Sequence, residues 1–437
     1  MSTGVILLAP PWPRSGSGNL FAAQAAAHAR RGCRVFLLLT PLGRPYSRRK
    51  TAVWRDAVAS MKFPGVETVA YPRAGRSKTR LQLQWLLAGR DDAIAISARY
   101  GASGQLPDEL AAFLASERID LIHANHVFSI PLARRVADMV ESLQGIRPRI
   151  LLDTHDIQSD VFAGQRRTNP ISQRPDDRAA LLRSELALCA QADALIHLTQ
   201  ADHDFFAARL PGRRHTLMLP TLHPDTEAEL KRRRGRHRRA KFDLIYVGNN
   251  HEANLETVRW LLREVLLFAG PAVRDRICII GTVGELLRQH DPALHRRHES
   301  LFGGEMPSLF DFYSAARAVL APATAGTGTS IKLIEALCVG KPVLTTSLAL
   351  RGLPHAEMTG RDLHVHDSAA DFADALTRLV DDAAPAPAAS LTNAALYDRL
   401  FSNARYFAAL DAVLDGSSSA RSPGRSPGRV GPRVAAE

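Results

Sequence analysis

Short apolar runs that alternate with helical segments limit the folds open to this chain more than any other feature. Each run has four to six mostly apolar residues and ends at a proline, glycine or polar residue, which is typical of a buried strand. Before a basic stretch they occupy residues 5–9, 35–40, 121–124, 150–153, 194–198 and 216–219, and after it residues 242–247, 276–280, 318–321 and 342–346. The pattern predicts helices between them, at residues 20–31, 106–116, 178–191, 255–268, 309–316, 330–339 and 371–380. Such alternation predicts an α/β chain with two doubly wound parallel sheets.

The 437 residues fit two domains of about 200 residues each. We expect an N-terminal domain over residues 1–225, a basic linker over 226–241, a C-terminal domain over 242–390, a terminal helix over 391–415 and a basic tail over 416–437. The composition of the tail, rich in Ser, Pro, Gly and Arg, is typical of disorder.

The basic stretch at residues 231–241 is polar and aperiodic, which indicates a solvated linker. A nucleic-acid patch is the alternative. No aromatic residue stands among its arginines, which argues against a stacking surface for bases, so we expect no nucleic acid partner.

The formal net charge is +12, carried mostly by arginine. A positive chain can bind nucleic acid, anionic membrane or anionic small ligands, although arginine richness can also follow from genomic base composition. The four cysteines are far apart and form no CxxC pair, so the sequence predicts neither a zinc site nor a disulfide framework. The apolar stretch at residues 4–9 is too short for a signal peptide, and no apolar run reaches the length of about 18 residues that a membrane span needs. We therefore expect a cytoplasmic protein.

Residues 323–343 form the most informative segment, because a predicted strand is followed there by a Gly-rich loop and a helix. The loop residues are Gly326, Thr327, Gly328, Thr329 and Ser330. Free amides at the start of a helix and the helix dipole favour a bound phosphate. Lys332 stands in the first turn, where a cation opposes the dipole and indicates an anionic partner. Glu335, one turn later, can accept hydrogen bonds from two ribose hydroxyls. The alternative for these two residues is a surface ion pair three positions apart.

Glu335-Ala336 and Gly340-Lys341-Pro342-Val343 resemble the second half of the acidic signature of the family 4 glycosyltransferases, which has two glutamates eight positions apart. The resemblance implies the GT-B fold, in which two Rossmann-like domains face a central cleft, the N-terminal one for the acceptor and the C-terminal one for the nucleotide sugar. It also places the nucleotide ribose on Glu335. The first glutamate of the signature is replaced by Thr327, so the contact to the donor sugar differs from that of the family.

Gly248 is followed by a second departure from the family pattern. Asn249 and Asn254 stand where family members often carry an arginine and a lysine that bind the donor diphosphate. Neutral amides cannot replace two charge-assisted hydrogen bonds. We expect Lys332 and Arg351 to supply the positive charge, with an ordinary loop arginine as the alternative for Arg351.

Two histidines follow or end predicted strands of the N-terminal half. The runs Asp120-Leu-Ile-His123 and Leu152-Asp153-Thr154-His155 resemble two strands of the family that end in a histidine. The resemblance implies that His155 points into the cleft at the donor sugar, with Asp156 supporting it. His123 is a second candidate.

The loop after the first strand contains three further candidates, Gly16, Gly18 and Asn19. In the family, a loop at this place covers the acceptor and the donor phosphate. The loop is not a dinucleotide fingerprint, because position 21 is Phe21. An ordinary turn between strand and helix is the alternative.

The resemblance implies transfer of a hexose-type sugar from a nucleoside diphosphate sugar to a glycan or lipid-linked acceptor, with retention at the anomeric carbon. It implies neither a metal nor a cofactor, and no metal-ligand spacing occurs in the sequence. Two alternatives stay open. One is a non-catalytic GT-B protein that binds a nucleotide or glycan or acts as a scaffold, and the other is a GT-B nucleotide-sugar epimerase.

A basic and aromatic segment in the N-terminal half provides a candidate membrane contact. Its residues are Arg44, Tyr46, Arg48, Arg49, Lys50 and Trp54. Such a segment could meet anionic lipid at the inner face of a membrane, as a lipid-linked acceptor requires. A solvated loop is the alternative.

Overall fold

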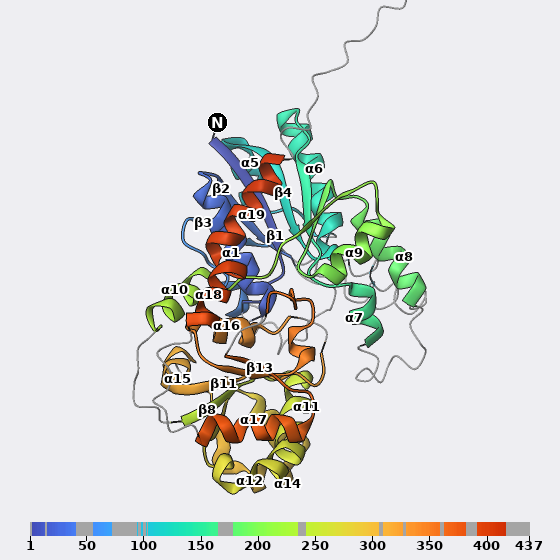
Figure 1. Ribbon diagram of the computed structural model, residues 1–437. Helices are drawn as coiled ribbons and strands as arrows, with labels where there is room; N and C mark the ends of the chain where they lie inside the picture. Colours follow the sequence, from blue (N-terminus) through green and yellow to red (C-terminus); the bar gives the residue numbers. More distant parts are fainter. Residues whose placement is uncertain are drawn as a thin grey trace, which may run out of the picture.

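A computed structural model describes residues 2–13, 15–40, 56–71, 94, 98, 102, 104–164, 178–234, 242–305, 309–326, 329–358, 362–381 and 391–416. Each of two parallel sheets is the centre of one α/β domain, and the two domains lie one above the other in Figure 1. The membrane-contact segment predicted around residues 44–54 and the tail after residue 416 lie outside the described residues.

The N-terminal sheet has the strand order β3-β2-β1-β4-β5-β6-β7, with every neighbouring pair parallel. Its strands are β1 (Ser2–Ala9), β2 (Arg34–Leu39), β3 (Val66–Ala70), β4 (Glu117–Asn125), β5 (Arg149–Asp153), β6 (Ala194–His197) and β7 (Arg214–Leu217). Its helices are α1 (Gly16–Arg30), α5 (Asp108–Ser116), α6 (Ile130–Gln144), α7 (Gln158–Gly164), α8 (Arg178–Cys189) and α9 (Gln200–Arg209). Alternate residues of β1 pack on opposite faces, since Ile6 joins the core under α5 and α6 while Leu7 packs toward α1.

The C-terminal sheet has the order β10-β9-β8-β11-β12-β13, also all parallel. Its strands are β8 (Phe242–Val247), β9 (Ile277–Ile280), β10 (Phe302–Gly304), β11 (Ala316–Leu320), β12 (Val343–Thr345) and β13 (Leu363–Val365). Its helices are α10 (Pro224–Arg232), α11 (Glu252–Trp260), α12 (Leu266–Arg274), α13 (Val283–His290), α14 (Pro292–Arg297), α15 (Leu309–Ala315), α16 (Ile331–Val339), α17 (Ala369–Asp381) and α18 (Leu391–Leu400). The prediction of two doubly wound parallel sheets is therefore confirmed.

The chain passes between the domains twice. After β7 it enters α10, whose Leu230 packs in the core of the C-terminal domain, so the stretch predicted as a linker begins in a helix. The predicted terminal helix is two helices, α18 on the C-terminal domain and α19 (Asn403–Gly416) on the N-terminal domain beside α1 (Figure 1). The break lies at Ser402, whose hydroxyl accepts a hydrogen bond from the Arg405 amide and so starts the new helix.

The helix predicted at residues 255–268 is longer than expected and irregular. It begins at α11, where the His251 side chain accepts a hydrogen bond from the Ala253 amide, passes through a π-helical turn at Leu261–Val265 and ends in α12. The strands β3, β10 and β13 were not predicted.

Candidate functional site

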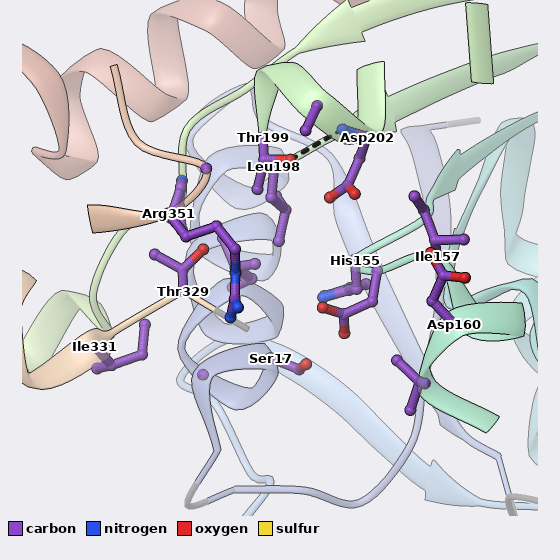
Figure 2. Close-up of a pocket in the computed structure, with 17 residues that line it drawn as sticks. Ser17, His155, Ile157, Asp160, Leu198, Thr199, Asp202, Thr329, Ile331 and Arg351 are labelled. Atoms are coloured by element: carbon purple, nitrogen blue, oxygen red, sulfur yellow. Dashed lines mark hydrogen bonds between the residues drawn. The ribbon is translucent and has the colours of Figure 1, made fainter. Parts of the chain in front are cut away.

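A cavity of about 420 Å³ opens between the two domains, at the carboxyl ends of their strands. The N-terminal domain lines it with the start of α1, the segment from β5 into α7 and the segment from β6 into α9. The C-terminal domain contributes Thr329 and Ile331 at the start of α16, and Arg351 and Gly352 after β12. Figure 2 shows Arg351 and Thr329 across the cavity from Ile157 and Asp160, with His155 between them.

The domains approach each other closely at two glycines that line the cavity. A β-carbon at Gly16 would lie 3.1 Å from Cγ1 of Ile331, so the start of α1 meets the start of α16. Gly352 has a φ of +78°, and a β-carbon there would lie 2.4 Å from Cγ2 of Thr199. Two helix N-termini from different domains therefore face one small volume, which suits an anion.

His155 lines the cavity and is held in a strained backbone conformation. Its φ is +62°, and His126, at the end of β4, has a φ of +59°. Such values are uncommon for residues other than glycine and cluster at functional sites. The two imidazole rings stack, with centroids 4.0 Å apart. Burial and the neighbouring His126 and His123 hold the pKa of His155 well below its usual value, so its ring is neutral.

Neighbouring amides fix the tautomer of His155. The Asn125 amide donates to the Leu8 carbonyl oxygen at 3.2 Å, which leaves Asn125 Oδ1 as an acceptor. His155 Nε2 lies 2.8 Å from that oxygen and therefore carries the proton. Nδ1 then holds the lone pair, and it has no hydrogen-bond partner among the described residues.

A buried polar group lies behind His155 and holds its backbone. Gln24 of α1 donates to Asn125 Oδ1 at 3.0 Å and to Asp153 Oδ2 at 3.1 Å, and the His155 amide donates to Asp153 Oδ1 at 3.3 Å. Burial raises the pKa of Asp153 to about 7. This group connects α1, β4 and β5, so the position of the His155 ring depends on three elements.

Three carboxylates line the N-terminal side of the cavity, from Asp156, Asp160 and Asp202. Burial raises the pKa of Asp156, opposed by the positive charge of Arg351. Burial also raises the pKa of Asp202, to about 6. Arg351 is the charged residue that the C-terminal domain adds to the described lining.

Glu335 lies on α16 outside this lining and is oriented by a tyrosine. The Tyr313 hydroxyl donates to Glu335 Oε2 at 2.7 Å, while Oε1 has no hydrogen-bond partner among the described residues. Burial raises the pKa of Glu335, and the hydrogen bond from Tyr313 and the charge of Lys332 oppose that shift. One carboxylate oxygen is thus available to accept hydrogen bonds from a ligand.

Lys332 does not pair with Glu335 within ion-pair distance in the described structure, but binds a cluster at the end of β8. Its Nζ lies 2.8 Å from the Tyr246 hydroxyl and 2.8 Å from Asn254 Oδ1. The Asn254 amide in turn donates to Asn249 Oδ1 at 2.6 Å. Burial lowers the pKa of Lys332 to about 7. The lysine and both asparagines thus form one hydrogen-bonded unit near Gly248, which directly follows β8.

The candidates from the sequence fall into separate groups. Gly16, His155, Thr329 and Arg351 line the cavity together, and Ser330 directly precedes α16. Gly248, Asn249, Lys332 and Glu335 lie on the C-terminal domain beyond that lining. Gly326, at the start of the Gly-rich loop, is also absent from the lining. Thr327 and Gly328 lie outside the described residues.

Three candidates of the N-terminal domain stay away from the cavity lining. His123 is fully buried, and its Nδ1 lies 3.1 Å from Nε2 of His28. The Gly18 amide donates to the Ser15 hydroxyl at 3.0 Å, so it belongs to the start of α1. Asn19 follows it in the first turn of that helix.

Sequence reasoning missed Ser17, Asp160 and Asp202 in the cavity, and His126 and Tyr313 beside the candidate residues. Tyr313 precedes Glu335 by 22 positions, and no local pattern joins the two residues. Two of the missed residues had a local signal, because His126 directly follows the strand that contains His123 and Ser17 lies between the candidates Gly16 and Gly18.

Comparison with known proteins bears on the fold. The model of the family described as glycosyl transferases group 1 matches residues 241–382, the C-terminal domain with Lys332 and Glu335. Sucrose-phosphate synthase from Thermosynechococcus elongatus is similar in structure, with a TM-score of 0.59 and 16% identity over 96% of this chain and 100% of that one. The chain has the GT-B fold.

Two further GT-B structures align over nearly the whole length. Anabaena HepE in complex with UDP and glucose has a TM-score of 0.56 and 14% identity, over 94% of this chain and 99% of that one. An α,α-trehalose-phosphate synthase (UDP-forming) from Burkholderia vietnamiensis has a TM-score of 0.59 and 13% identity, over 97% and 99%. A search of curated protein sequences finds no match.

Neither a metal-ligand cluster nor a membrane-spanning helix occurs in the described part of the chain. No group of three or more His, Cys, Asp or Glu side chains there has the arrangement of a metal site. None of the helices described combines the length and the apolar character needed to cross a bilayer.

Proposed function

We propose that this protein is a GT-B glycosyltransferase that moves a hexose-type sugar from a nucleoside diphosphate sugar to a hydroxyl of a glycan or lipid-linked acceptor, with retention. The main support for this proposal is the cavity where the starts of α1 and α16 meet, between His155 of one domain and Arg351 of the other. The match to the group 1 glycosyl transferases supports a nucleotide-sugar site in the C-terminal domain. The similarity to HepE, whose structure contains UDP and glucose, supports a diphosphate nucleotide.

In this proposal the C-terminal domain holds the donor nucleotide. Glu335 accepts hydrogen bonds from the ribose hydroxyls, with Tyr313 fixing its carboxylate at 2.7 Å. The diphosphate lies against the N-termini of α1 and α16, whose dipoles favour negative charge. Lys332 and Arg351 supply the cations that the family usually places at the positions of Asn249 and Asn254.

The hydrogen bond from Lys332 to Asn254 supports the proposal that Lys332 replaces the family's lysine. The Lys332 ammonium lies 2.8 Å from Asn254 Oδ1, at the residue where family members carry a lysine. A charge is thus present near that place although the side chain comes from α16. The leaving diphosphate would be stabilised by preorganised donors that need no rearrangement.

The donor sugar would then lie beside His155, which the strained backbone aims at the cavity. A neutral ring whose Nδ1 lone pair is available can accept a hydrogen bond from a sugar hydroxyl. Positioning of the acceptor hydroxyl and stabilisation of charge supply the rate enhancement, and no protein nucleophile is required.

The test combines binding with turnover. Thermal shift is measured for the wild type and Glu335→Ala with UDP, GDP, CDP, ADP and dTDP, and the matching nucleotide sugars are then incubated with pooled glycan acceptors. We expect one base to stabilise the wild type selectively, the mutant to lose that effect, and a glycoside of retained anomeric configuration to form. Binding without any turnover would favour the non-catalytic alternative, and epimerised sugar nucleotide without acceptor would favour the epimerase.

A further inference from the structure

The N-terminal side of the cavity carries a charge opposite to that of the whole protein. The chain has a formal net charge of +12, yet Asp156, Asp160 and Asp202 all line this side. Asp156 and Asp160 come from the segment after β5, and Asp202 comes from the first turn of α9. Two separate connections of the N-terminal domain therefore bring carboxylates to one surface.

These carboxylates are only partly compensated. Asp160 pairs with Arg178 at 2.5 Å between Oδ1 and Nε. Asp202 lies beside Thr199, whose hydroxyl accepts a hydrogen bond from the Asp202 amide (Figure 2). The Asp156 carboxylate has no hydrogen bond or ion pair with another described residue, and the opposite charge that acts on it is that of Arg351.

His155, which the proposed function places beside the donor sugar, gives the border of this surface the same acceptor character. It is only 4% exposed, it lines the same cavity, and its Nδ1 carries a lone pair without a described partner. Carboxylates and an unprotonated ring nitrogen are all hydrogen-bond acceptors. A ligand on this surface must therefore supply the donors.

Sugar hydroxyls and ammonium groups supply donors, whereas a phosphate dianion brings only acceptors and a like charge. We propose that this side of the cavity selects an acceptor sugar that is uncharged or carries an amine, and that it rejects a phosphorylated one. The inference rests on the proposed function and names the acceptor class for it. The donor diphosphate escapes the repulsion because it lies across the cavity, on the side of Arg351 and α16.

The experiment uses three sugars that share one ring but differ in charge: glucose, glucosamine and glucose 6-phosphate. Each is added to the full-length protein already saturated with the nucleoside diphosphate that stabilises it, and binding is followed by saturation-transfer NMR at low and high salt. We expect glucose and glucosamine to bind, with glucosamine at least about fivefold tighter than glucose 6-phosphate at low salt, and this ratio to shrink as salt rises.

Two isosteric variants and one control locate the effect. Asp156→Asn and Asp202→Asn each remove one charge from the cavity, and we expect each to reduce the glucosamine preference roughly threefold. Asp204→Asn removes the same charge from the same helix, two residues further on, where the side chain is 66% exposed and outside the lining. We expect this control to keep the wild-type ratio.

Glucose 6-phosphate binding as tightly as glucose, or ratios unchanged in both cavity variants, would overturn the inference. Binding of none of the three sugars would overturn it as well, because the cavity would then not be a sugar site. Nucleotide binding is measured in the same samples. Its presence would keep the donor assignment intact, and its absence would point to failure of the proposed function itself.

Discussion

The two sides of the cleft differ in chemistry although both are built at the carboxyl ends of parallel strands. The N-terminal side presents acceptors, namely Asp156, Asp202 and the neutral His155. The C-terminal side presents the cation Arg351, and Lys332 lies beyond the lining in the first turn of α16. One protein thus separates a surface suited to hydroxyl donors from a surface suited to a diphosphate. The comparison teaches that each domain can be tested for its own ligand.

The largest expected effect concerns the N-terminal side. We expect His155→Asn to lower turnover about 100-fold while nucleotide affinity changes less than about twofold. Asparagine tolerates the positive φ of this position, so the fold should persist. Initial rates and calorimetry on the same preparation measure the two quantities. Equal losses of turnover and nucleotide affinity would show that the two sides do not act separately.

The next effect concerns Glu335 and its tyrosine. We expect Glu335→Gln to weaken nucleoside diphosphate binding about tenfold, because a neutral amide accepts weaker hydrogen bonds than a carboxylate. Tyr313→Phe removes only the orienting hydroxyl, and we expect it to weaken nucleoside diphosphate binding about threefold. Calorimetric titration measures both. A larger loss for Tyr313→Phe than for Glu335→Gln would move the ribose contact away from Glu335.

The third prediction uses pH. Burial lowers the pKa of Lys332 to about 7, so its ammonium is mostly charged below that pH and mostly neutral above it. A diphosphate binds the charged form, so affinity should be highest below pH 7 and fall as pH rises, by up to about tenfold per unit. Titrations from pH 6 to 9 measure this slope. Lys332→Met introduces an uncharged side chain of similar length. This variant should bind the diphosphate weakly at pH 6 and lose most of the dependence of affinity on pH. A mutant that keeps the wild-type slope would exclude Lys332 as its source.

The smallest effect concerns metals. If Lys332, Arg351 and two helix N-termini neutralise the diphosphate, EDTA should change the transfer rate by less than about twofold. Rates with EDTA and with added Mg²⁺ or Mn²⁺ provide the check. Complete loss of activity on chelation, restored by one metal, would mean that these protein groups alone do not neutralise the diphosphate.

The alternation of strands and helices was enough to predict both sheets, because parallel strands covered on both faces are short continuous apolar runs. The missed strands β3, β10 and β13 are all edge strands, and β10 has only three residues, of which two are glycine. Because the sheet is covered on both faces, every residue from 121 to 130 is buried. The sequence therefore does not show toward which face the side chains of His123 and His126 point. Apolar periodicity therefore could not indicate which histidine lies beside the site.

The sequence names candidate residues where one segment carries them and misses candidates where distant segments meet. Residues 326–335 of the Gly-rich loop and helix are local, so Lys332 and Glu335 could be named from the sequence. Asp160 and Asp202 start surface helices, where an acidic residue is ordinary in the first turn. Only the folded chain brings them to one cavity.

A crystal structure of the complex with the stabilising nucleoside diphosphate tests the division of the cleft most directly. The account predicts the ribose hydroxyls on Glu335 and the diphosphate between the starts of α1 and α16, within reach of Lys332 and Arg351. A nucleotide bound against Asp156 and Asp202, or outside the cleft, would contradict it.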